Sequence, residues 1–278
     1  MAPSTSSFVQ PLSCRPQGIE AMVADTTCTF ARHFHEDFGI GLIHRGAQKS
    51  MSGRGLIEAG PGDVITVNPG EVHDGAPLND AGRGWRMLYL PPSLVADVGQ
   101  DILGQGRQVE FSQPRLADRR LSQGFANAFA AAMAPASATS PLAWEENLIL
   151  LLSGLIQARS KEPCPIPASI ARVREQLDDA PLSAPSLAQL ADAAGLSRYQ
   201  LIRAYTRATG LTPHAYLIQR RLQQARGLIQ GGRSLVESAA ASGFADQSHL
   251  TRLFKRTYGY TPGAYARSSV SLQLRSRR

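Results

Sequence analysis

Short runs of β-forming residues alternate with turn residues near the start of the chain, from about residue 18 to 92. Runs at 40–43, 56–58, 64–67 and 85–90 are separated by Gly, Pro, Asn and Asp residues, with turns about every eight to twelve residues. Many short strands at that spacing are typical of an antiparallel β-sandwich or β-barrel. We expect an antiparallel β-barrel in this part of the chain.

The apolar period lengthens to three or four residues between about residues 115 and 160. Ser140 and Pro141 are typical of a helix N-cap and a first helical residue. Two helices are predicted, with these apolar positions at helical spacing: Leu121, Phe125 and Phe129 in the first, and Trp144, Leu148, Leu151, Leu152 and Leu155 in the second. Either this helical hairpin only packs on the barrel, or one helix also contacts a second subunit.

A proline-rich segment at 161–167 follows, and its three prolines cannot continue a helix. The charge balance changes sign there. Residues 1–165 carry 13 Lys and Arg against 16 Asp and Glu, whereas residues 166–278 carry 16 against 6, which gives the chain its net charge of +7. A basic half of this kind indicates either a solvated surface or a polyanionic partner such as nucleic acid.

These changes in pattern divide the chain into four parts. We predict an α+β protein with an N-terminal antiparallel β-barrel and helical hairpin at 18–160, a linker at 161–167, an all-α domain at 168–267, and a basic tail without fixed structure at 268–278.

The all-α domain contains an internal repeat. The two copies match at an offset of 48 residues from Ser186 to Gly195 and, after one inserted residue, at an offset of 49 from Leu201 to Tyr216. The identical pairs include Ser186 and Ser234, Leu187 and Leu235, Gly195 and Gly243, Leu201 and Leu250, Arg203 and Arg252, Gly210 and Gly259, Thr212 and Thr261, Pro213 and Pro262, and Tyr216 and Tyr265. A duplicated unit fixes the architecture of the domain that contains it.

Each copy reads as a short Ala-rich helix, a glycine turn and a longer helix, beginning at the N-cap serines Ser186 and Ser234. This is the helix-turn-helix pattern, whose second helix enters the DNA major groove. One copy alone would also fit a plain helical hairpin, but two copies in a basic domain favour DNA binding. Between them, a helix from Pro213 to about Gln230 would form a rod of roughly 25 Å, which can place two such helices in successive major grooves.

Helical period separates the buried and outward faces of the two second helices. Arg203 and Arg252 lie outward at equivalent positions, and arginine can bind guanine with two hydrogen bonds. Tyr199 and Ile202 could pack on thymine methyl groups, whereas Arg198, Arg207, Lys255 and Arg256 are placed to meet phosphates. The predicted DNA-contacting residues are Arg198, Tyr199, Ile202, Arg203, Thr206, Gln247, Ser248, Thr251, Arg252 and Lys255.

The stretch 168–267 resembles the DNA-binding domain of AraC/XylS-type transcription regulators, most specifically from Gly243 to Pro262. The resemblance implies that both second helices contact DNA and that a linking helix joins them. Ser238 stands where the family usually has a large aliphatic residue, which predicts looser packing in the second unit. Ile202 and Thr206 are less polar than the residues that many family members have at these positions. This predicts that the first unit recognises a narrower range of bases.

The N-terminal region resembles the regulatory cupin barrel of such proteins, through 32–36 for the first cupin motif, and 60–63 with 68–73 for the second. In metal-bearing cupins, two histidines and a carboxylate from the first motif join a histidine from the second. His33, His35 and His73 match the histidines, but Gly39 and Ile40 replace the carboxylate.

Three roles are open for these histidines: ligands of a metal ion, hydrogen-bond partners of a small effector, or satisfied groups of the barrel interior. We expect effector contacts, with neither metal nor cofactor. An arginine in the same pocket would favour a carboxylate-bearing effector, and the resemblance points to sugars or amino acids. The predicted effector-binding residues are His33, His35, His73, Trp85 and Arg86.

The sequence therefore predicts a ligand-responsive, sequence-specific transcription regulator that binds double-stranded DNA and a small effector, contacts RNA polymerase, and is a candidate homodimer. The alternatives are a metal-dependent cupin enzyme fused to a DNA-binding module, and a DNA binder that responds to no effector. Its three cysteines, without a CxxC pair, fit the reducing cytoplasm. We expect no signal peptide, no membrane span and no catalytic site.

Overall fold

A computed structural model of the chain describes residues 7–14, 16, 18–135, 141–159, 166–183 and 185–275. The predicted cap Ser140 and most of the predicted linker lie outside these residues. The N-terminal unit contains most of two β-sheets and helices α1 to α3, and the C-terminal unit comprises Ala31–His33 and Glu162–Ala266. The order predicted from the sequence, an antiparallel β domain followed by a helical domain, is confirmed.

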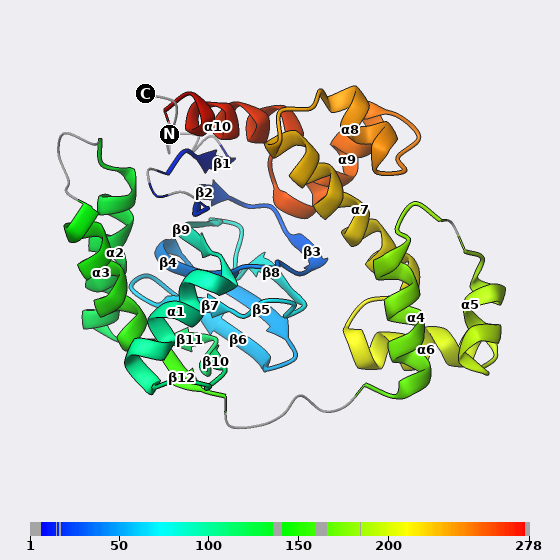
Figure 1. Ribbon diagram of the computed structural model, residues 1–278. Helices are drawn as coiled ribbons and strands as arrows, with labels where there is room; N and C mark the ends of the chain where they lie inside the picture. The colour runs from blue at the N-terminus through cyan, green and yellow to red at the C-terminus, as the bar shows by residue number, and fades with distance from the viewer. Residues whose placement is uncertain are drawn as a thin grey trace. The chain divides into compact units, whose positions relative to one another are not determined.

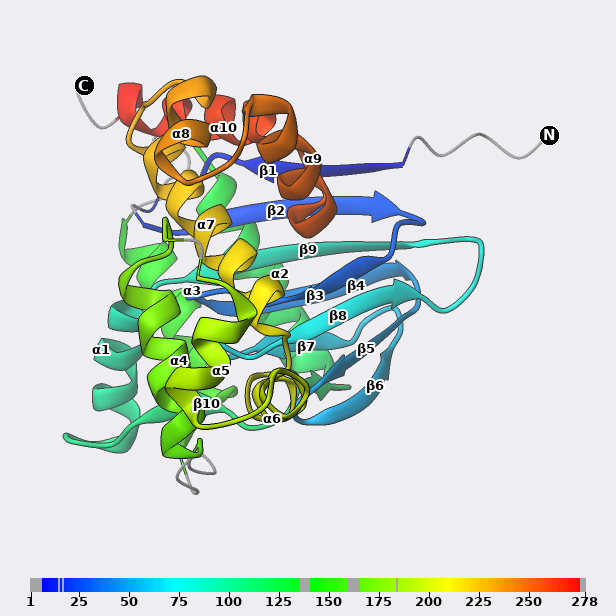
Figure 2. The same cartoon turned by 90° about the vertical axis from the view of Figure 1, so that its right-hand side faces the viewer.

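The strands of the N-terminal unit, called the β domain below, form two sheets instead of one closed barrel. Figure 2 shows these strands lying roughly along one axis, with paired strands antiparallel. One sheet has the order β1 (Phe8–Leu12), β2 (Glu20–Thr26), β9 (Arg83–Leu90), β4 (Phe38–Gly46), β7 (Val64–Val67) and β11 (Arg115–Leu116). The other has the order β3 (Phe30–His33), β8 (His73–Pro77), β5 (Gln48–Ser52) and β6 (Gly55–Ala59).

Alternation along β9 gives the larger sheet two different faces. Leu88 and Leu90 belong to the apolar core shared with the helices, whereas Met87 lies on the opposite face. There Met87 packs directly over the backbone of β4, because a Cβ atom at Gly41 would overlap its sulfur atom. The glycine at position 41 is therefore required by the close approach of a side chain.

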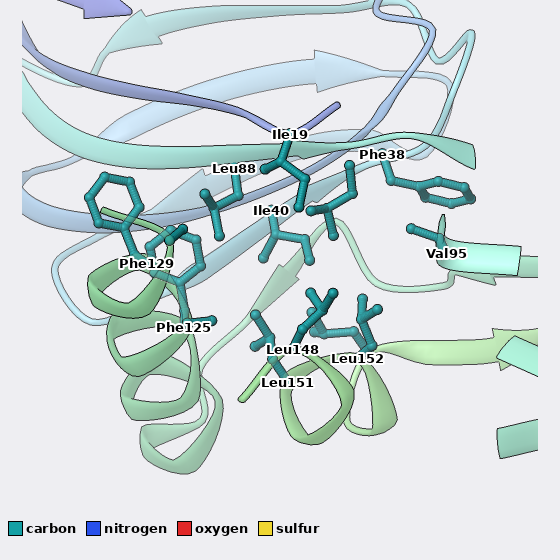
Figure 3. Close-up of a cluster of buried hydrophobic side chains, with 14 of the residues drawn as sticks. Ile19, Phe38, Ile40, Leu88, Val95, Phe125, Phe129, Leu148, Leu151 and Leu152 are labelled. Carbon is teal, nitrogen blue, oxygen red and sulfur yellow. The ribbon is translucent and has the colours of Figure 1, made fainter. Parts of the chain in front are cut away.

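Three helices cover one face of the larger sheet: α1 (Pro92–Leu103), α2 (Arg119–Met133) and α3 (Pro141–Ser153). A small sheet of β10 (Val109–Phe111) and β12 (Ile156–Ala158) accompanies them. Both predicted helices are confirmed as α2 and α3, which pack against each other. Figure 3 shows the core that they form with the strands: Ile19, Phe38, Ile40, Leu88, Val95, Phe125, Phe129, Leu148, Leu151 and Leu152.

The C-terminal unit is helical, as predicted. Its helices are α4 (Ala168–Asp179), α5 (Leu187–Ala194), α6 (Arg198–Thr209), α7 (Pro213–Gln230), α8 (Leu235–Ala241), α9 (Gln247–Tyr258) and the start of α10 (Pro262–Arg275). Both helix-turn-helix pairs are present, as α5 with α6 and α8 with α9. The helix α10 continues past residue 267, so it covers most of the tail that the sequence was expected to leave without fixed structure.

Local chemistry explains why the boundaries of these helices were predictable. Ser186, Ser197 and Ser234 each cap a helix, and the residue three positions later returns a side-chain bond to the backbone N–H of the serine. Gly195 ends α5 in the left-handed conformation, which favours glycine. Among the helices of the described residues, none combines the length and the apolar character that crossing a bilayer requires.

Candidate functional site

The outward face of α6 carries an arginine stacked on a tyrosine. Tyr199 is 67% exposed, and the guanidinium of Arg203 lies over its ring, 5.6 Å from the centroid. The opposite face of the helix holds Leu201 and Tyr205, both fully buried. The burial pattern therefore presents Arg203 to solvent and fixes the rotation of α6 about its axis.

The other predicted contacts on α6 differ in exposure. Arg198 is exposed, whereas Ile202 and Thr206 are half-buried, and the Thr206 hydroxyl is shielded without a hydrogen-bond partner. A hollow runs along this face, lined by residues that include Ile166, Tyr199, Ile202, Arg203 and Thr206. Arg203 and Tyr199 are thus the most prominent groups of this helix surface.

The outward face of α9 is more polar. Gln247, Ser248, Arg252 and Lys255 are exposed and Thr251 is half-buried, whereas Leu250 and Phe254 are fully buried. Phe254 packs in a cluster of aromatic rings with Tyr258, Tyr260 and Tyr265. Arg252 therefore faces solvent at the position that Arg203 occupies in the first unit.

The helix α7 connects the two helix-turn-helix pairs, as Figures 1 and 2 show. It packs against α4 and α6 toward one end and against α8 and α9 toward the other. Its 18 residues give a rod of about 27 Å. Arg221, at the middle of the rod, donates hydrogen bonds to the carbonyl oxygens of Pro181 (2.8 Å) and Gly243 (3.0 Å), and so contacts the segment before the first pair and the turn within the second pair.

The second pair contains an unsatisfied buried group. Ser238 on α8 is fully buried, and its hydroxyl has no hydrogen-bond partner. The hydroxyl of Ser242 is also buried without a hydrogen-bond partner. A buried hydroxyl without a partner destabilises the fold.

The three predicted histidines of the β domain lie together. His33 ends β3, His73 begins β8, and His35 follows β3 in the chain. Their nearest ring nitrogens all lie within 4.8 Å of one another. The His35 ring also lies 5.4 Å from that of His73 and 4.7 Å from that of Tyr89, measured between centroids.

Backbone carbonyls orient two of these rings. The Nδ1 atom of His33 bonds to the carbonyl oxygen of Ala31 (2.7 Å), and that of His73 to the carbonyl oxygen of Glu71 (2.9 Å). A carbonyl oxygen only accepts, so Nδ1 carries the proton, and in the neutral ring Nε2 keeps its lone pair. Burial lowers the pKa of His73, which favours the neutral form. Neutral imidazoles can act as metal ligands or accept hydrogen bonds from an effector.

Trp85 and Arg86 do not join one site, because consecutive residues of a strand point to opposite faces. Trp85 is buried, whereas Arg86 is exposed and its guanidinium lies 5.6 Å from the ring centroid of Phe129 on α2. The structure therefore places Arg86 on the helix-covered face of the sheet, away from Trp85. The prediction that Trp85 and Arg86 line one pocket did not take account of this alternation of side chains along a strand.

A different arginine accompanies Trp85. Arg83 is 1% exposed, and its guanidinium lies 4.8 Å from the ring centroid of Trp85 and 5.6 Å from that of Phe30. It donates hydrogen bonds to Gln48 Oε1 and to the carbonyl oxygen of Cys28. Burial lowers the pKa of Arg83 to about 10, so the side chain stays charged near neutral pH. Its position two residues before Trp85 was the sequence signal that could have identified it.

Comparisons with known proteins agree with this arrangement. Residues 18–152 match the model of the AraC-like ligand binding domain, and residues 190–268 match that of a helix-turn-helix domain. The chain is 29% identical to the HTH-type transcriptional regulator YbfI of Bacillus subtilis, over 80% of this chain and 81% of YbfI. It is 35% identical to the transcriptional activator NphR of a Rhodococcus species, over 56% of this chain and 43% of NphR.

Solved structures show the same fold. A structure of apo ToxT from Vibrio cholerae has a TM-score of 0.57 and 14% identity, covering 91% of this chain and 98% of that one. A ToxT structure with a bound unsaturated fatty acid has a TM-score of 0.54 and 15% identity, covering 96% and 97%. The fold of this chain, over nearly its whole length, is therefore one already seen in solved structures.

Proposed function

This chain belongs to the AraC family of transcriptional regulators, and on that premise we propose how it reads DNA and what controls it. The family is one of regulators and not of enzymes. In our proposal, α6 and α9 bind successive major grooves of one operator, and a small effector in the β domain shifts the equilibrium between DNA-binding arrangements. An effector can do so only if it binds one arrangement better than another.

The observation that carries the DNA-binding proposal is the common exposure of Arg203 and Arg252. Both lie on the solvent side of equivalent helices whose other sides are buried. Arginine at such positions can bind guanine O6 and N7 and so select a base pair. Around them, Tyr199, Gln247, Ser248 and Thr251 would add base contacts, whereas Arg198 and Lys255 would bind phosphates. Ile202 and Thr206, being half-buried, would contribute less.

For the effector, we propose a site between the two sheets that includes His33, His35, His73 and Trp85. Arg83 takes the place that the sequence gave to Arg86. Its buried charge favours an effector with a negative or strongly polar group. Sugars and amino acids remain the first classes to test, and fatty acids join them because one structure of ToxT contains an unsaturated fatty acid.

Footprinting of the DNA upstream of the gene that encodes this chain, with and without these compounds, tests the proposal. The expected result is protection of two sites about one helical turn apart on one face of the DNA, altered by the compound that also binds in calorimetric titration. His73→Ala should weaken that binding. Equal footprints under every condition would favour a DNA binder that responds to no effector.

We also propose two macromolecular partners. The relative NphR is a transcriptional activator, so contact with RNA polymerase is the simplest route to activation, and the chain would act in the cytoplasm. A second copy of the chain is the other partner. Leu142 (71% exposed) and Leu150 (63%) of α3 are exposed apolar side chains that a second copy could cover.

A further inference from the structure

The side chain of Arg221 on α7 bonds to backbone on both sides of that helix. Its Nε atom donates to the carbonyl oxygen of Pro181 (2.8 Å), Nη2 donates to that of Ser183 (3.4 Å), and Nη1 donates to that of Gly243 (3.0 Å). Pro181 and Ser183 belong to the connection that leads into α5, whereas Gly243 lies in the turn between α8 and α9. Within the described residues, these acceptors are main-chain carbonyls and not carboxylates, so the bonds fix backbone positions instead of pairing two charges.

The shape of the guanidinium group gives these bonds a common reference. The group is planar and presents its N–H groups in fixed directions. Nε and Nη2 share one edge of the plane and face the connection before the first pair, whereas Nη1 points to the turn of the second pair. One rigid group therefore sets the direction from one segment to the other. Apolar packing along α7 does this less well, because the hydrophobic effect is not directional.

The turn of the second pair also packs closely on this side chain. Gly243 has a φ of 73°, in the left-handed region that favours glycine, and a Cβ atom there would lie 3.1 Å from Cζ of Arg221. The equivalent Gly195 of the first pair has a φ of 65°, but a Cβ atom at that position would meet none of the described atoms within 4 Å. The contact between a turn glycine and α7 therefore belongs to the second pair and is not a general property of the repeat.

We propose that Arg221 is a positioning residue for DNA binding, which sets the distance and the rotation between α6 and α9. It would thereby determine which spacing of the two DNA sites the chain accepts. This role rests on the proposed function, in which the two helices bind successive major grooves. Linked binding modules gain affinity only where both can bind at once. One inserted base pair moves the second site by about 3.4 Å and rotates it by about a tenth of a turn, and a rigid pair of helices cannot follow both changes.

Selection of duplexes from a random DNA library by the full chain, followed by sequencing, tests this role. The wild type should select two motifs at one spacing. Arg221→Lys keeps the positive charge, but its single ammonium group cannot donate in the same fixed directions. This variant should select the same two motifs at several spacings. When one base pair is inserted between the motifs, the affinity of the wild type should fall by about tenfold or more, and that of Arg221→Lys should fall by much less.

Gln224→Ala provides the control. Gln224 also lies on α7, but within the described residues its side chain donates to the carbonyl oxygen of Ala241 in the second pair alone (3.1 Å). Its removal should therefore leave the single spacing unchanged. Circular dichroism and thermal unfolding verify that each variant is folded, and Arg221→Gln replaces Arg221→Lys if the latter does not fold.

Three results would overturn the role of Arg221. If the folded Arg221 variants select one spacing, as the wild type does, the proposed function stands and Arg221 does not set the spacing. If they select neither motif, the residue is required for the recognition surface itself and not for its spacing. If the wild type already selects several spacings, the binding of α6 and α9 to successive grooves at a fixed distance is wrong, and the role of Arg221 falls with it.

Discussion

The guanidinium of Arg203 lies over the ring of Tyr199, one helical turn earlier on the exposed face of α6. In the second unit, the position equivalent to Tyr199 is Ser248, which has no ring to offer Arg252. The two equivalent arginines therefore have different surroundings: Arg203 is stacked on an aromatic ring, whereas the equivalent neighbour of Arg252 is a serine. A stacked arginine loses less conformational freedom when it binds a base, so the first unit is better preorganised.

We predict that Tyr199→Ala weakens binding to the specific operator several-fold, since an exposed cation–π contact contributes about 0.5–1 kcal/mol. Tyr199→Phe keeps the ring and should bind nearly as the wild type does. Fluorescence anisotropy with a labelled operator provides the measurement. Equal losses in the two variants would show that the hydroxyl group, and not the ring, is what DNA binding requires.

Arg252 and Lys255 are both exposed on α9, but we expect different consequences from their removal. Arg252→Ala should cost about 1–3 kcal/mol of specific binding and relax the preference at one base pair. Lys255→Ala should weaken binding to all sequences alike and reduce the slope of log K against log salt by about one unit. Binding to an operator library at several salt concentrations separates the two effects. Unchanged operator preference in Arg252→Ala would refute its role in base readout.

The stability of the β domain should depend on pH through His73. Burial lowers the pKa of His73 in the folded protein below its ordinary value of 6.5, so the unfolded chain binds the proton more readily. The stabilisation from the neutral ring is complete above pH 6.5 and is lost as the pH falls through the folded pKa. In metal-free buffer, urea unfolding of the wild type should therefore show lower stability at acid pH.

His73→Gln should flatten this dependence because glutamine does not titrate in this range. The exposed His214 on α7 supplies the control, and His214→Gln should retain the wild-type profile. A wild-type profile in His73→Gln would assign the acid sensitivity to other groups.

Much of the helical unit was predictable because the signals are local. Ser186, Ser197 and Ser234 cap their helices with side chains three residues away, and the apolar period separates Leu201 from Arg203 within one turn. The β domain depends on pairing between strands that are distant in the sequence. The sequence therefore predicted the strands, but it did not predict that they divide into two sheets. The strand period could place Arg83 on the same face as Trp85, but the hydrogen-bond partners of Arg83, Gln48 and Cys28, come from distant parts of the chain.

The buried hydroxyl of Ser238 leads to a prediction about stability. Because this hydroxyl is fully buried on α8 without a hydrogen-bond partner, Ser238→Ala removes an unsatisfied group and should stabilise the C-terminal unit by about 1 kcal/mol. Alanine also favours the helix more than serine does, by a few tenths of a kcal/mol. Ser248→Ala on the exposed face of α9 measures that smaller contribution alone. Urea unfolding of the full chain should place Ser238→Ala above both Ser248→Ala and the wild type, whereas equal gains in the two variants would mean that the Ser238 hydroxyl carries no penalty.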